Sequence, residues 1–267
     1  MEEYKNEKYL KNEIMDQSRH QFIYGYNNEH RSNFFKSLEK DYPLTIDANK
    51  PTALYFDCLG MPQLDVDLNE KNKYLIDAAS REYLSFAIVT KILEKSMEFD
   101  KTILDTRLSR LINIINESRN AGYTEIEKVT DLLKEIKISR DFYYENYINY
   151  VKGLTEKISI DDISIPFLQL EIFVRLYKEA MNMDSYFGII FDKKNPLAIS
   201  STKAINNLIG ARINKDMSMK IVTEPDNWET YKDVNGQFIE AIHDYGTIEL
   251  DNSYEDMKKL TKKPKQI

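Results

Sequence analysis

The pattern that most constrains this chain is a set of short apolar runs near both ends, separated by a long stretch of helical periodicity. Residues 21–24 and 51–57 are rich in aromatic and β-branched side chains, and glycines follow them at Gly25 and Gly60. Such runs are typical of buried strands. Similar runs return later in the chain and are expected to complete one sheet, at residues 186–192, 217–223, 237–239 and 245–250.

Residues 72–183 carry apolar side chains at helical spacing, and this stretch accommodates roughly four to six helices. Shorter helices are expected over residues 1–19, 32–40 and 202–212. Strands that alternate with helices favour an α/β fold with a parallel sheet. The expected organisation is a discontinuous α/β core, a large helical insertion and a C-terminal tail, over residues 1–60 with 185–252, 61–184 and 253–267 respectively.

Charge, cysteine content and hydropathy exclude several classes of protein. The 267 residues carry a net charge of −7, which argues against nucleic-acid binding through overall charge and leaves only a local basic patch for such a partner. Cys58 is the only cysteine, so neither an intrachain disulfide nor a cysteine zinc cluster is expected. No apolar run approaches the roughly 18 residues of a membrane span, and the polar N-terminus does not fit a signal peptide. The expected location is the cytoplasm, with no membrane partner.

The turn after the first strand carries the most specific pattern in the sequence. Residues 25–32 align with the phosphate loop G-x-x-x-x-G-K-[ST], in which backbone N–H groups surround phosphates, the lysine contacts them and the hydroxyl binds magnesium. Gly25 and Ser32 match, Arg31 keeps the positive charge of the lysine, and His30 replaces the second glycine. The nucleotide-binding residues expected in this loop are Gly25, Asn27, Asn28, His30, Arg31 and Ser32.

A later strand agrees with this alignment. Residues 187–192 form a continuous apolar run that ends in Asp192, like the Walker B strand whose aspartate helps to hold magnesium. Lys193 follows, where a glutamate commonly polarises the attacking water. Hydrolysis by this chain is therefore expected to be slow, if it occurs at all.

Together, the variant phosphate loop, the strand that ends in Asp192 and the succession of five strands resemble the P-loop ATPases of the AAA type, including origin-recognition-like ATPases. The resemblance covers about residues 18–60 and 185–252, and it implies that the strands next to Gly25 and Asp192 lie close together. The helical insertion at residues 61–184 resembles no family that we can name.

The resemblance also implies roles for individual residues and a pair of ligands. Arg31 would contact phosphate, Ser32 and Asp192 would hold magnesium, and Thr223, at the end of the fourth strand, would sense the terminal phosphate of ATP. The chain would then be an ATP-binding switch or slow ATPase that acts with a protein partner or as a homo-oligomer.

Two alternatives stay open. In the first, the chain is a non-enzymatic interaction protein that keeps the P-loop architecture, has lost nucleotide and docks a partner through the helical insertion. In the second, the match is accidental, which a sheet that holds the strands of Gly25 and Asp192 far apart would indicate. The first alternative predicts no binding of ATP at millimolar concentration.

Other polar residues carry weaker patterns. Asp57 ends the second strand and could face the same crevice, although a strand-end carboxylate is more often simply solvated. Glu224 follows Thr223 and could substitute for the missing catalytic base. His243 and Asp244 fit a turn between strands better than an acid–base pair. Trp228 is expected to be half-buried in a loop.

Overall fold

The computed structural model describes seven ranges of the chain, which are residues 2–25, 29–57, 73–118, 125–151, 153–155, 169–211 and 215–250. Asn27, Asn28 and the expected C-terminal tail lie outside these described residues.

A five-stranded sheet, in which every pair of neighbours is parallel, forms the centre of the molecule. Its strand order is β2-β3-β4-β1-β5. The expectation of an α/β fold with a parallel sheet is thereby confirmed. The strands are β1 (His20–Tyr24), β2 (Thr52–Asp57), β3 (Phe187–Asp192), β4 (Met217–Thr223) and β5 (Tyr245–Glu249).

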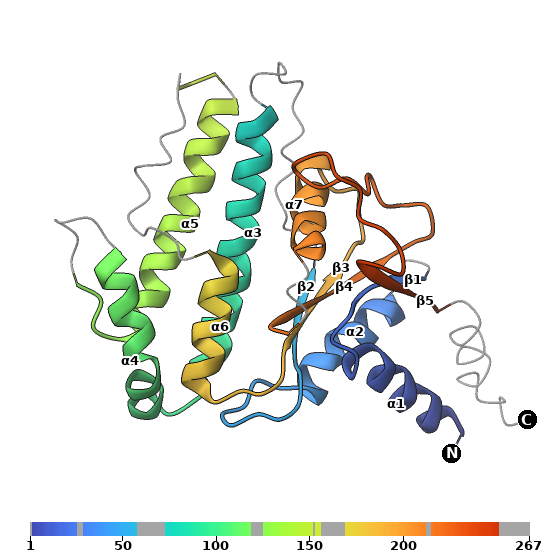
Figure 1. The fold of residues 1–267 in the computed structure, drawn as a ribbon, viewed down its shortest axis with the longest axis horizontal. Coiled ribbons are helices and arrows are strands. Elements are labelled where there is room, and N and C mark those ends of the chain that lie inside the picture. The colour runs from blue at the N-terminus through green and yellow to red at the C-terminus, as the bar shows by residue number, and fades with distance from the viewer. Residues whose placement is uncertain are drawn as a thin grey trace, which may run out of the picture.

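Helices cover both faces of the sheet, as a parallel sheet requires. The helices α1 (Glu2–Met15) and α2 (Glu29–Asp41) lie on one face, and the remaining helices lie on the other side (Figure 1). Within the described ranges, no helix is long and apolar enough to cross a membrane. The helices on the second side are α3 (Lys73–Ser96), α4 (Lys101–Ser118), α5 (Val129–Val151), α6 (Leu170–Met181) and α7 (Ile199–Gly210).

Alternation along the strands divides the core into two apolar clusters. Ile23, Ile190 and Val222 point toward α1 and α2, where they pack with residues of those helices. The neighbouring positions on the same strands point the other way, and their cluster continues without interruption into α3 through α7. The long helical stretch therefore shares one apolar core with the sheet.

One expected strand is wrong. Residues 237–239 do not join the sheet, and within them only Phe238 makes an isolated antiparallel bridge, with Lys232. The Asp233 carboxylate instead accepts the backbone N–H groups of Asn235 and Gln237, and Gly236 has a positive φ of 80°. Phe238 is 65% exposed. Backbone hydrogen bonds pair this run with residues 231–233, and the bonds to the Asp233 carboxylate close the turn between them. The run therefore forms a small local hairpin in place of a strand of the sheet, with Ile239 buried and Phe238 exposed.

Candidate functional site

A buried ion pair joins the start of α2 to the end of β3. Arg31 Nη2 donates to Asp192 Oδ1 at 3.0 Å, and the two side chains are 1% and 0% exposed. Ser32, the next residue of α2, donates from Oγ to Asp192 Oδ2 at 2.6 Å. Residues about 160 positions apart in sequence thus meet at the C-terminal edge of the sheet, where ligands gather in open α/β folds.

The Arg31 guanidinium is held on several sides. Its Nη1 donates to the carbonyl oxygen of Gly25 at 2.6 Å, and its Nη2 also donates to the carbonyl oxygen of Lys193 at 2.9 Å. Gly25 follows β1, and its own N–H donates to Thr223 O at 3.0 Å. From the first turn of α2, Arg31 therefore connects the ends of β1 and β3, which are separated in the sheet by β4.

Tyr55 completes the shell around Asp192. Its hydroxyl donates to Asp192 Oδ2 at 2.7 Å, from the neighbouring strand β2. Burial, and then the hydrogen bond to Asp192, raise the pKa of Tyr55 above its ordinary value, so the hydroxyl stays protonated and remains a donor. Tyr55 was not among the site residues predicted from the sequence. The signal was present, because Tyr55 precedes Asp57 by two positions on a strand and a buried tyrosine hydroxyl needs a partner.

Lys193 and Thr223 belong to a different group of contacts. Lys193 Nζ forms an ion pair with Glu229 Oε1 at 2.8 Å and donates to Asn227 Oδ1 at 3.2 Å. The Thr223 hydroxyl donates to the carbonyl oxygens of Glu224 and Asn227 at 3.3 Å each. The structure therefore brings Gly25, Arg31, Ser32 and Asp192 together. The Thr223 hydroxyl is not part of that group, because it is hydrogen-bonded to the loop that follows β4.

The other expected residues occupy the surface or turns. His30 is exposed in the first turn of α2. His243 is exposed, and the Asp244 carboxylate accepts the backbone N–H of Glu240 at 2.8 Å, which fits the expected turn. Trp228 is only 7% exposed, so it is more deeply buried than expected, and its indole N–H donates to Asn206 Oδ1 at 3.2 Å.

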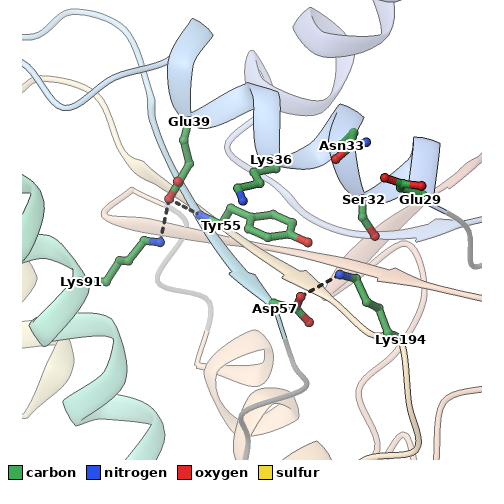
Figure 2. Close-up of a pocket in the computed structure, with 9 residues that line it drawn as sticks. All are labelled: Glu29, Ser32, Asn33, Lys36, Glu39, Tyr55, Asp57, Lys91 and Lys194. Atoms are coloured by element: carbon green, nitrogen blue, oxygen red, sulfur yellow. Dashed lines mark hydrogen bonds and ion pairs between the residues drawn. The ribbon is translucent and has the colours of Figure 1, made fainter.

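A pocket of about 550 Å³ opens beside the buried network. Its walls come from α2, the end of β2, α3 and the residue that follows Lys193 (Figure 2). Lys194 forms an ion pair with Asp57 at 2.7 Å, and Lys91 forms one with Glu39 at 3.1 Å. The pocket is lined by Glu29, Ser32, Asn33, Lys36, Glu39, Tyr55, Asp57, Lys91 and Lys194.

The residues at this edge have the chemistry needed to hold a magnesium ion that carries phosphate. Magnesium prefers oxygen ligands and commonly takes only one or two from protein, with the rest from water and phosphate. Ser32 Oγ and Asp192 Oδ2 are two such oxygens, 2.6 Å apart. No group of three or more histidine, cysteine or acidic side chains that could hold a metal by themselves occurs in the described part of the chain. The first turn of α2 adds the positive end of a helix dipole.

Comparison with known proteins identifies no relative: no protein family, curated protein or solved structure matches the chain. The class that the fold defines is an α/β protein with a five-stranded parallel sheet.

Proposed function

We propose that this chain binds ATP with magnesium at the edge where β1 and β3 end, and that nucleotide acts there as a switch for a protein partner. The observation that carries the proposal is the meeting of Arg31 and Ser32, both from the variant phosphate loop, with Asp192 at hydrogen-bond distance. Topology alone places these residues at one edge of the sheet, and the direct hydrogen bonds from Arg31 and Ser32 to Asp192 go beyond what that placement requires.

The strand order supports a ligand at this edge. In both common doubly wound folds β1 neighbours β2, whereas here β1 lies between β4 and β5. The connection from β1 leads across the sheet toward β2, and the connection from the neighbouring β4 leads the opposite way, to β5. The chain after β1 enters α2 on one face of the sheet, whereas Trp228 and Ile239, in the chain after β4, pack into the apolar cluster on the other face. Connections that leave neighbouring strands toward opposite faces leave a crevice at the carboxyl ends, and ligands bind in such crevices. Gly25 follows β1, and Thr223 ends β4.

The same side chains would serve the bound ligand. Ser32 and Asp192 would hold the magnesium ion, which neutralises phosphate charge when it is bound. Arg31 would contact phosphate, and the loop at residues 25–32 would surround it with backbone N–H groups. The Thr223 hydroxyl would have to leave the carbonyl oxygens of Glu224 and Asn227 to sense the terminal phosphate.

The buried ion pair gives this site two alternative arrangements. Without ligand, Arg31 neutralises Asp192 and is 1% exposed. To contact phosphate, the guanidinium must exchange the carboxylate for the ligand, and Asp192 is then available to magnesium. A ligand that favours one of two arrangements shifts the population between them. Since Arg31 also bonds Gly25 and Lys193, its movement would alter the ends of two strands, which suits a switch better than rapid turnover.

A second candidate function is docking without nucleotide. It is favoured by the number of donors on Asp192, because Arg31, Ser32 and Tyr55 already satisfy both carboxylate oxygens. In this alternative the ion pair is purely structural and stabilises the sheet, and the helices α3 to α6 would bind the partner.

Calorimetric titration with ATP and magnesium separates the two functions. Saturable binding is expected for the native chain, and Arg31→Ala or Asp192→Ala should weaken it by about 10- to 100-fold, the value of one or two lost charged hydrogen bonds. Arg31→Lys restores the residue of the phosphate-loop pattern and should retain binding. Arg140→Ala and Asp141→Ala, which alter an exposed ion pair on α5, are the matched controls. Absence of binding at millimolar ATP in both the native chain and Arg31→Lys would favour docking.

A further inference from the structure

The pocket beside the ion pair contains a second carboxylate close to Asp192. β2 and β3 are neighbours, and Asp57 on β2 is the register partner of Asp192 on β3. Asp57 lines the pocket together with Ser32 and Tyr55, whose hydroxyls both donate to Asp192. Asp57 therefore lies on the same side of the sheet as the proposed magnesium ligands.

The position that directly follows Asp192, where P-loop ATPases commonly carry the glutamate that polarises the attacking water, holds no carboxylate in this chain. Lys193 occupies it, and its ammonium group is engaged by Glu229 and Asn227. Because side chains alternate along a strand, Lys193 points to the opposite face from Asp192. The next residue returns to the pocket, where Lys194 forms its ion pair with Asp57 at 2.7 Å (Figure 2).

We propose that Asp57 is the carboxylate that orients the attacking water in slow hydrolysis of ATP, an inference that rests on the proposed function. The water oxygen forms a bond to the terminal phosphorus, and the bond from that phosphorus to the bridging oxygen breaks. The electron pair of that bond leaves with ADP. Asp57 accepts the proton of the water. Lys194 holds the Asp57 carboxylate in place and offers positive charge to the phosphoryl oxygens.

Glu29 is the rival carboxylate in the same pocket. It lies in the first turn of α2 and is exposed. Asp57 is better placed for the role, because it stands on a strand that is hydrogen-bonded to the strand of Asp192 and its side chain is fixed by Lys194. Catalytic groups whose side chains are fixed by a partner hold their geometry better than groups that are not fixed. Glu29→Gln therefore tests the rival assignment, and Asp141→Asn, at an exposed ion pair of α5 away from the pocket, is the matched control.

The test compares the native chain with Asp57→Asn, Glu29→Gln and the control Asp141→Asn in two measurements. The first is single-turnover hydrolysis of ATP with magnesium. Asp57→Asn should slow it by about 100-fold or more, the usual contribution of a positioned general base, and the control Asp141→Asn should not. The second is equilibrium binding, in which Asp57→Asn should leave ATP affinity within about twofold but weaken ADP with aluminium fluoride by at least about tenfold, because that complex mimics the transition state. Thermal unfolding checks that each variant is folded.

The outcomes separate this inference from the proposed function. Native hydrolysis that Asp57→Asn leaves unchanged, or that Glu29→Gln abolishes, would overturn the role of Asp57 alone. A native chain that binds ATP but never turns it over would do the same and leave the nucleotide switch standing. A native chain that binds no ATP at all would overturn both.

Discussion

Breaking the ion pair between Arg31 and Asp192 has an effect on stability that can be estimated from its burial. The two side chains are 1% and 0% exposed, and the donor and acceptor atoms are 3.0 Å apart. Removal of one partner leaves the other charge in a site from which water is excluded, which costs about 3–5 kcal/mol. Removal of both charges together avoids that penalty, so the two substitutions should be strongly non-additive.

A double-mutant cycle with Arg31→Met and Asp192→Asn measures this coupling. Each single variant should lose about 3 kcal/mol or more of unfolding free energy, and the double variant should lose about 2–3 kcal/mol less than the two losses added together. Urea unfolding at neutral pH, followed by circular dichroism, gives all four values. The control cycle uses Lys137→Ala and Glu94→Ala, an ion pair whose side chains are 41% and 45% exposed and whose coupling should stay below about 1 kcal/mol.

The cycle would refute the described arrangement if either single variant cost less than about 1 kcal/mol. Additivity within about 0.5 kcal/mol would refute it equally, since residues in direct contact do not behave independently. In either case Arg31 would not be buried against Asp192 in the ligand-free chain, and the exchange between carboxylate and phosphate would lose its starting state.

Two further predictions concern pH and packing. His20 accepts the backbone N–H of Met219 at 2.9 Å, and burial lowers its pKa from 6.5 to about 4. The unfolded chain therefore binds more protons between these pH values, so stability should fall by up to about 3 kcal/mol as the pH drops through that window, and His20→Gln should flatten the slope in urea titrations. Gly25→Ala would place a Cβ 2.8 Å from Leu250 Cδ1 and 3.1 Å from its Cβ, which should cost about 1–3 kcal/mol in the same assay, and less in a Leu250→Ala background.

The strands and helices were predictable where a segment's own pattern decides its structure. Residues 217–223 form the expected strand, and residues 187–192 form nearly the expected one, because strands buried on both faces are rich in apolar residues. Ser218 and Lys220 are buried polar exceptions within the first of these strands. Residues 237–239 share that apolar character but lie among turn-forming residues. Asp233 and Gly236 form a turn there. A run of three residues is too short for the sequence to indicate whether this turn or pairing in the sheet is favoured.

The position of the candidate site was predictable, but its internal bonding was not. Gly25 follows β1, and Asp192 ends β3. Arg31 and Ser32 lie in the first turn of α2, which begins at the same edge of the sheet. The proximity of the four residues therefore follows from topology. Whether a long side chain such as Arg31 turns outward to solvent or inward to a carboxylate depends on the packing of three strands and a helix. Sequence spacing carries no information on that choice, whereas Tyr55 could have been predicted from its position two residues before Asp57 on the same strand.

The central claim is that ATP replaces Asp192 as the partner of Arg31. Titration of the arginine-labelled chain with ATP and magnesium, followed by NMR of the guanidinium nitrogens, tests it most directly. The Arg31 signal, assigned with Arg31→Lys, should shift saturably at the ATP concentrations that calorimetry gives for binding, while the signal of Arg140 on the surface of α5 stays in place. An Arg31 signal that does not move at millimolar ATP would contradict the replacement of Asp192 by phosphate. The ion pair would then have a purely structural role.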